Sequence, residues 1–310
     1  LLNYIATISL VGLTLTTGCL KGEEVNTTRI GLAISSAGNS WWHTATYYAV
    51  TQASSLQQPY FLANADSASQ QQIQLTAMAY PTLQQEACKA IILSDLGQSV
   101  DSIQKYIDMG IDIILFDCNI PVDYTCRISG NNAAAGKAAG EFIRTHPATA
   151  TLIIQVQDSP VGTTRAEGCK AQLTTPVMEV TSKAYTQAAG KKAMEEALAA
   201  ADGAQIGAVY AMDDDVAIGV LTALQEAENT TVKTVVGCGG SQTFLLLIHT
   251  TAGLNLATTV YSPESIEQCV DIANTLTIQG TQPAQKEYIT EMPLVDRNNA
   301  ADYINPASRY

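Results

Sequence analysis

Three consecutive carboxylates, Asp213–Asp215, stand in the middle of the stretch AVYAMDDDVAIGVLTALQEA. The apolar residues 206–210 before them predict a buried strand, and the apolar spacing from Val216 onward predicts an amphipathic helix. One of the first two aspartates should cap this helix by accepting a hydrogen bond from a free backbone N–H. The loop between such a strand and helix is also where open α/β sheets hold small ligands.

Polar or aromatic residues follow other predicted strands in the same way. The ends of these strands should converge on a crevice, where flat rings cover the face of a sugar and charged groups bond its hydroxyls. Each residue alone could be structural: Asp117 an edge cap, Arg165 a surface charge, one Trp a core residue. The candidate ligand-binding residues are Asn39, Trp41, Trp42, Asp117, Arg165, Tyr185, Asp213 and Tyr261.

Enzyme signatures are missing from the sequence. There is no GxSxG elbow for a catalytic serine, no HExxH, and no GK[ST] after the glycine-rich GCGGS. The chain has 3 histidines and no CxxC, which gives little support to a metal or redox site. We therefore expect a binding protein without catalytic residues, metal or cofactor.

The elements that position these residues alternate along the chain. The apolar runs RIGLAIS, PYFLANAD, AIILS and IDIILFDC predict strands separated by helices, and a second such array begins near GNNAAAGKAAGEFIRTH. Continuously apolar strands that alternate with helices form parallel sheets covered on both faces. The sequence thus predicts an α/β fold of two Rossmann-like lobes with parallel sheets, joined by short hinge crossings.

Length and charge fit this interpretation. A chain of 310 residues is long enough for two domains. Its formal net charge is -13, and only 15% of its residues are charged. Nucleic acid is not an expected partner, because binding it requires clustered Lys and Arg.

The N-terminal residues form an apolar run that ends in Thr-Thr-Gly-Cys. This pattern is typical of a lipoprotein signal peptide, residues 1–18, cleaved before a lipid-anchored Cys19. Residues 19–27 would then be a polar tether. An ordinary secretion signal cut elsewhere is the alternative, and either one places the mature protein in the periplasm or at the outer face of the cytoplasmic membrane.

Six further cysteines follow Cys19. Four of them have apolar neighbours and are predicted to be small buried side chains: Cys88, Cys169, Cys238 and Cys269. Cys118 and Cys126 flank the short loop NIPVDYT, where a local disulfide and two free thiols are both open alternatives.

Several segments occur in an order that resembles the type I periplasmic sugar-binding proteins of ABC importers, in particular the ribose and galactofuranose binders. The segments are NSWW, AIILS with IDIILFD, NNAAAG, TTRAEG, AYTQAAGKKAME, YAMDDDVAIGVLTALQEA and PLVDRNNAADY. The resemblance covers about residues 28–310. It implies a three-segment hinge, with residues 28–122 and 262–287 in an N-terminal lobe and 123–261 and 288–310 in a C-terminal lobe.

The resemblance also implies a monomer that holds its ligand between stacked aromatics and a polar ring, and delivers it to a membrane permease. Four positions depart from the family pattern. Asp213 replaces an Asn, Cys118 the Arg of a DR pair, Gly239 the Asp of a DG pair, and Tyr261 a Gln. The lost donors predict a ligand that is less hydroxylated than a pentose or hexose, or partly cationic.

Three functions fit a fold of this kind. The first is an extracytoplasmic solute-binding lipoprotein that serves a sugar-type ABC importer. The second is a solute sensor whose closed form engages a membrane signalling receptor. The third, a transcription repressor, would need a helix-turn-helix before residue 28, where an apolar secretion segment stands instead.

Overall fold

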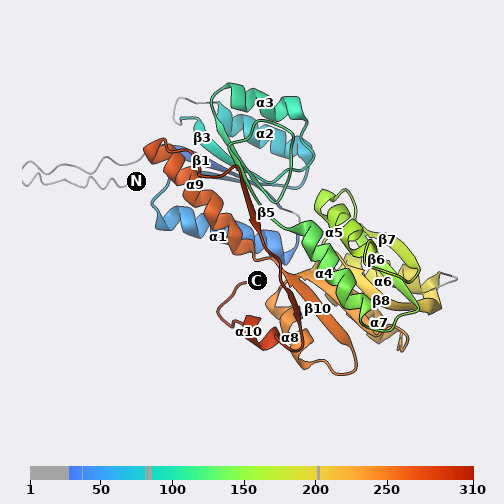
Figure 1. The fold of residues 1–310 in the computed structure, drawn as a ribbon. Helices are drawn as coiled ribbons and strands as arrows, with labels where there is room; N and C mark the ends of the chain where they lie inside the picture. Colours follow the sequence, from blue (N-terminus) through green and yellow to red (C-terminus); the bar gives the residue numbers. More distant parts are fainter. Residues whose placement is uncertain (1–27, 37, 81, 83–85, 201–202) are drawn as a thin grey trace, which may run out of the picture.

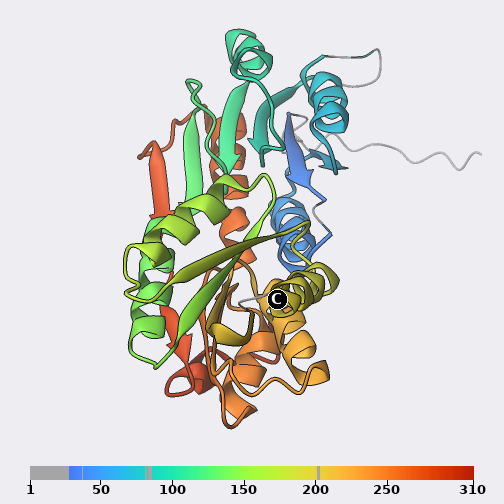
Figure 2. The ribbon, with the colours of Figure 1, turned by 90° about the vertical axis from the view of Figure 1, so that its right-hand side faces the viewer.

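The computed structural model describes residues 28–36, 38–80, 82, 86–200 and 203–310. They form two lobes, each built on one sheet covered by helices (Figures 1 and 2). The predicted signal peptide, the anchor Cys19 and the tether lie outside the described residues. The two-lobed α/β fold predicted from the sequence is confirmed.

The first lobe contains a six-stranded, wholly parallel sheet in the order β11-β5-β4-β3-β1-β2. Helices α1 and α9 pack on one face, and α2 and α3 cover the other. The elements of this lobe are β1 (Arg29–Ser35), α1 (Ser40–Ser55), β2 (Tyr60–Ala65), α2 (Ala68–Ala79), β3 (Cys88–Leu93), α3 (Val100–Asp108), β4 (Asp112–Phe116), β5 (Cys126–Gly130), η2 (Pro263–Ser265), α9 (Ile266–Gln279) and β11 (Glu287–Thr290).

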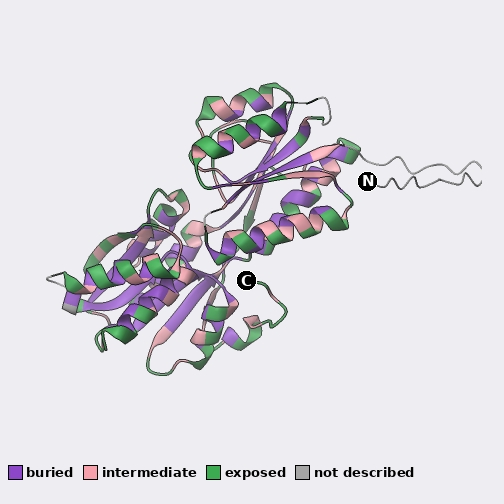
Figure 3. Cartoon of the chain, turned by 180° about the vertical axis from the view of Figure 1, so that it is seen from behind, coloured by how far each residue is buried: buried purple, intermediate pink, exposed green. Residues whose placement is uncertain are grey.

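The second lobe contains another six-stranded sheet, in the order β12-β10-β9-β8-β6-β7, in which only β12 is antiparallel. Figure 3 shows buried strands and exposed outer helix faces in both lobes. The elements are α4 (Asn132–Arg144), β6 (Ala150–Val156), α5 (Pro160–Lys170), β7 (Val177–Ser182), α6 (Gln187–Ala199), η1 (Gly203–Gln205), β8 (Ile206–Ala211), α7 (Asp214–Glu226), β9 (Thr234–Gly239), α8 (Gln242–Thr250), β10 (Asn255–Val260), β12 (Leu294–Asp296) and α10 (Ala300–Tyr303).

The chain passes between the lobes three times. It crosses from β5 to α4, from β10 to η2, and from β11 to β12. Backbone hydrogen bonds hold these passages together, since Asn131 N–H donates to the Thr290 carbonyl and Val260 N–H to the Pro293 carbonyl. Parallel connections of this kind allow one lobe to rotate on the other about a few residues.

Two predicted lobe boundaries differ from the observed sheets. Strand β5 pairs with β4 in the first sheet, although the boundary before residue 123 assigned it to the second lobe. Strand β11 pairs with β5 through Thr290, so the boundary after residue 287 cuts a strand of the first sheet. The first sheet therefore extends to Gly130 and resumes at Glu287.

Glycines allow the helices of the second lobe to pack closely in pairs. A Cβ on Gly136 of α4 would collide with the backbone carbonyl of Arg165 in α5. A Cβ on Gly219 of α7 would collide with the carbonyl of Gln187 in α6. Glycine at these two positions thus allows α4 to approach α5 and α7 to approach α6.

The six cysteines among the described residues are free thiols. The four predicted to be buried are buried. Cys118 and Cys126 are also free, which excludes the local disulfide in favour of its alternative. The Cys118 thiol donates to the Leu93 carbonyl at 3.4 Å instead.

Candidate functional site

Trp41 and Trp42 open helix α1 and have different environments. Trp41 is only 6% exposed and stacks on Phe116 and Tyr261, with ring centroids 5.6 and 5.3 Å away. Its indole N–H donates to the Tyr261 carbonyl at 2.8 Å. Trp42 is half-buried and meets Trp41 edge-on at 4.8 Å. Trp41 is therefore a core residue, whereas Trp42 keeps part of its ring surface accessible.

Asn39 precedes this helix and caps it. Its side-chain oxygen accepts a hydrogen bond from the Trp42 N–H at 3.0 Å, and the residue is buried. A cap of this type satisfies one of the free amides of the first turn. The oxygen of Asn39 is thus committed to positioning the two tryptophans.

Asp117 follows β4 with a left-handed backbone, at φ 50°. Its Oδ1 is buried and has no hydrogen-bond partner among the described residues. Burial raises the pKa of this carboxyl to about 6, although Arg165 and Arg127 pull it down. A buried acceptor without a partner costs about 1 to 3 kcal/mol, so this atom is available for a hydroxyl donor.

Arg165 comes from helix α5 of the other lobe and is 6% exposed. Its Nε donates to Asn132 Oδ1 at 2.7 Å, and its Nη1 donates to the Met212 carbonyl at 2.8 Å. Burial lowers the pKa of the guanidinium, but Cys238, Asp117 and Tyr185 more than offset this and the net shift is upward. Arg165 is thus a fixed positive charge that interacts with Asp117 across the lobes.

Tyr185 lies three residues beyond the end of β7, in the loop before α6. Its hydroxyl shares a very short hydrogen bond with Ser159, the cap of α5. Burial raises the pKa of the phenol to about 12, with Arg165 pulling it down and Asp213 adding to the rise. Tyr185 therefore lies close to both charged candidates of the second lobe.

Asp213 caps helix α7, as the sequence predicted, by accepting from the Asp215 N–H at 2.8 Å. Burial raises its pKa well above the ordinary value, and the neighbouring Asp214 and Asp215 add to the shift. Burial therefore favours the neutral form of Asp213 over a wider pH range than for an exposed carboxyl.

Asp214 is fully buried and structural. It accepts hydrogen bonds from the N–H groups of Gly240 and Ser241, at 2.7 and 2.6 Å, and from the Thr258 hydroxyl at 2.7 Å. Burial raises its pKa to about 6, with these hydrogen bonds opposing the shift. The second aspartate of the triplet thus ties β9 and β10 to the start of α7.

Asp215 connects the two lobes. Its Oδ2 accepts from the Ser40 hydroxyl at 2.7 Å and from the Ser40 N–H at 3.2 Å. Ser40 starts helix α1 of the first lobe. This contact holds the start of α1 in the first lobe against the start of α7 in the second.

Tyr310 is a residue of this region that sequence reasoning missed. Its side chain is 7% exposed and packs in one apolar cluster with Trp41 and Tyr261. Its hydroxyl lies where a side chain at Gly239 would begin. Nothing in the local pattern of the last residues signals this, because the residue follows no predicted strand.

Several buried polar atoms of this region lack hydrogen-bond partners among the described residues. They are the Asp117 Oδ1 and the hydroxyls of Tyr210, Tyr261 and Tyr310. Ser265 lies near the Tyr261 hydroxyl, but outside hydrogen-bond geometry. A ligand with several hydroxyls would satisfy such atoms, since each one left unpaired costs stability.

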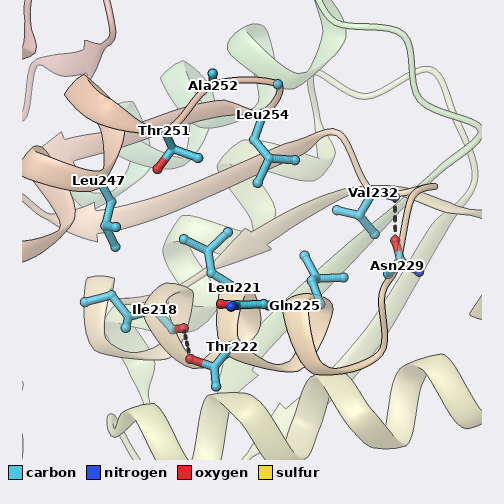
Figure 4. Close-up of a pocket in the computed structure, with 12 residues that line it drawn as sticks. Ile218, Leu221, Thr222, Gln225, Asn229, Val232, Leu247, Thr251, Ala252 and Leu254 are labelled. Carbon is cyan, nitrogen blue, oxygen red and sulfur yellow. Dashed lines mark hydrogen bonds between the residues drawn. The ribbon is translucent and has the colours of Figure 1, made fainter.

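A separate hollow lies on the outer face of the second lobe (Figure 4). It has a volume of about 550 Å³ and is lined by side chains of α7, α8 and the loop after α8, such as Leu221, Leu247 and Leu254. None of the candidate ligand-binding residues contributes to it.

Within the described part of the chain, three metal-ligating side chains nowhere come together, and no helix is long and apolar enough to cross a membrane.

Two α/β lobes with polar and aromatic residues gathered between them define a hinged solute-binding protein. The chain belongs to the periplasmic binding protein domain family, whose sequence model matches residues 30–282. No curated protein matches the chain.

Many solved structures share the fold. A galactofuranose-binding protein aligns with a TM-score of 0.79 at 19% identity, over 89% of this chain and 97% of its own. The arabinose-binding component of a Shewanella ABC transporter aligns with a TM-score of 0.76 at 21% identity, over 89% of this chain and 94% of its own. The myo-inositol-binding protein of Caulobacter aligns with a TM-score of 0.78 at 17% identity, over 92% of this chain and 98% of its own. At these identities the likeness establishes the fold alone.

Proposed function

We propose that the protein captures a small sugar or cyclic polyol between its lobes and delivers it to an ABC importer. The observation that carries this proposal is the set of buried, unpaired hydroxyls together with the unpaired oxygen of Asp117, which follows Phe116, the ring that contacts both tryptophans. Solutes rich in hydroxyls both donate and accept hydrogen bonds, and so match this set. The fold neighbours that bind arabinofuranose and myo-inositol support the same ligand class.

The candidate residues divide the contacts among them. Asp117 would accept from ligand hydroxyls, while Arg165, Tyr185 and Asp213 would donate to ligand oxygens. The accessible face of Trp42 would cover the apolar side of the ring. Asn39, Trp41 and Tyr261 would support this face through the cap and the ring stack.

Binding would act by shifting a population of open and closed forms. The solute contacts both lobes, so it favours the closed form in which Ser40 meets Asp215. A membrane permease would recognise that form. In this proposal the protein is a monomer that works outside the cytoplasm, with Cys19 as lipid anchor, and no bond of the ligand is broken.

A melting-temperature screen tests the proposal. The purified protein is mixed with L-arabinose, D-ribose, D-galactose, D-allose, myo-inositol or glycerol, each at 1 mM. A ligand present at about 100 times its Kd adds about 2.7 kcal/mol of stability and raises the melting temperature. At least one of these solutes should do so.

A matched pair of variants then tests the site. Arg165→Lys removes a guanidinium that makes two fixed hydrogen bonds, whereas Arg144→Lys changes an exposed arginine on α4. Only the first should abolish the shift. The proposal fails if no solute raises the melting temperature, or if both variants respond like the unchanged protein.

A further inference from the structure

The last residues of the chain extend from the second lobe to the first. The Gln242 N–H at the start of α8 donates to the Tyr310 carbonyl at 3.0 Å. The Thr44 hydroxyl of α1 donates to the Arg309 carbonyl at 3.3 Å, and the Arg309 guanidinium lies 4.1 Å from the ring centre of Tyr47. Figure 1 shows the C-terminus between the lobes. Residues 309–310 therefore contact both lobes beside the candidate site.

The Tyr310 ring fills a space that strand β9 leaves open. Gly239 ends this strand at φ 135°, a conformation that favours glycine. A Cβ at position 239 would overlap the Tyr310 hydroxyl and lie 3.5 Å from Asp214 Oδ2. A side chain at 239 and the Tyr310 ring are therefore mutually exclusive, and Tyr310 supplies the polar atom at this strand end.

The Tyr310 hydroxyl is buried and unpaired. Burial raises its pKa well above the ordinary value, and Asp213, Asp214 and Asp215 add to the shift, so the phenol keeps its proton. The neighbouring Asp214 already accepts three hydrogen bonds. A protonated phenol without an acceptor, at the carboxyl end of a strand between two lobes, is placed to donate to a ligand.

We propose that Tyr310 is a specificity-determining residue of the interlobe site. Its hydroxyl donates to a ligand oxygen. Its ring occupies the space beside the end of β9, and so reduces the room that is left there for the ligand. This inference rests on the proposed function, because it assumes a hydroxylated ligand between the lobes. It selects small polyols with an oxygen directed at the Tyr310–Gly239 edge.

The test compares Tyr310→Phe with Tyr303→Phe by titration calorimetry against L-arabinose and myo-inositol. Tyr303 is half-buried in α10 of the same C-terminal segment and packs against the core of the second lobe. Removing one hydrogen bond from a buried ligand weakens binding about tenfold or more. We expect this loss in Tyr310→Phe for the better of the two ligands, and unchanged affinity in Tyr303→Phe.

Urea denaturation without ligand separates a binding role from a packing role. Tyr310→Phe keeps the ring and removes an unpaired buried hydroxyl, so its stability should equal or exceed that of the unchanged protein. Two results would overturn this inference and leave the proposed function standing. One is unchanged affinity in Tyr310→Phe, and the other is a loss of affinity accompanied by a loss of stability. If the unchanged protein binds neither L-arabinose nor myo-inositol, the inference falls, and the proposed function falls only if the wider screen is also negative.

Discussion

Replacing Asp117 with Asn removes the negative charge of a half-buried carboxylate while keeping the side-chain shape. The backbone at φ 50° is one that Asn tolerates well. Burial raises the pKa of the carboxyl from 3.8 to about 6, even with Arg165 and Arg127 nearby. The folded protein thus binds this proton more tightly than the unfolded chain does, and it loses stability as the pH rises from 3.8 to 6.

The size of this loss of stability follows from the pKa shift of Asp117. A change from 3.8 to about 6 corresponds to about 3 kcal/mol, reached in full above pH 6. We expect Asp117→Asn to raise the free energy of unfolding by up to about 3 kcal/mol at pH 7. The gain should shrink between pH 6 and 3.8 and vanish at lower pH. Sugar affinity should fall at the same time, because the amide replaces one carboxylate oxygen with an N–H donor and carries no charge.

Urea denaturation followed by tryptophan fluorescence at pH 7 and pH 4 measures the effect. The control is Asp158→Asn, which makes the same substitution at a left-handed position, φ 56°, where the side chain is exposed. It should change stability little at either pH. A loss of stability in Asp117→Asn at pH 7, or an equal gain at both pH values, would refute the reasoning.

Three further substitutions have defined outcomes. Thr258→Val removes a 2.7 Å hydrogen bond to buried Asp214 and should lower the free energy of unfolding by about 1.5 to 3 kcal/mol in urea denaturation. Gly219→Ala forces a Cβ into the backbone of α6 and should lower the melting temperature strongly in calorimetry; an unchanged melting temperature would show that the two helices separate without cost. Ser40→Ala removes the 2.7 Å contact with Asp215 and should weaken sugar binding severalfold in titration without lowering stability; unchanged affinity would show that this contact does not favour closure.

The order of strands and helices was predictable because most strands are continuous apolar runs. Strand β5, CRISG, was missed because it is short and includes Arg127 and Ser129. Its pairing with β11 joins residues about 160 positions apart, a relation that no local pattern contains. The misplaced lobe boundaries follow directly from this missed strand.

The reasoning from strand ends put Asp117 of the first lobe in the same region as Arg165 and Asp213 of the second, and the electrostatic interaction of Asp117 with Arg165 agrees with this. It could not separate Trp41 from Trp42, because adjacent helix positions differ only in which one faces the core. Nor could it find Tyr310, which reaches the site from the end of the chain through contacts with α1 and α8. That each candidate binds a ligand stays a prediction.

The chain passes between the lobes three times, and this determines how the molecule can be divided. The passages run from β5 to α4, from β10 to η2, and from β11 to β12. Neither half is a continuous piece of the polypeptide, so no single cut in the gene releases one of them intact. A graft of one half onto a relative must exchange separate gene segments at once. Synthesis must also reach residues 287–290 before the first sheet has its outermost strand, which makes completion of both halves a late event in folding.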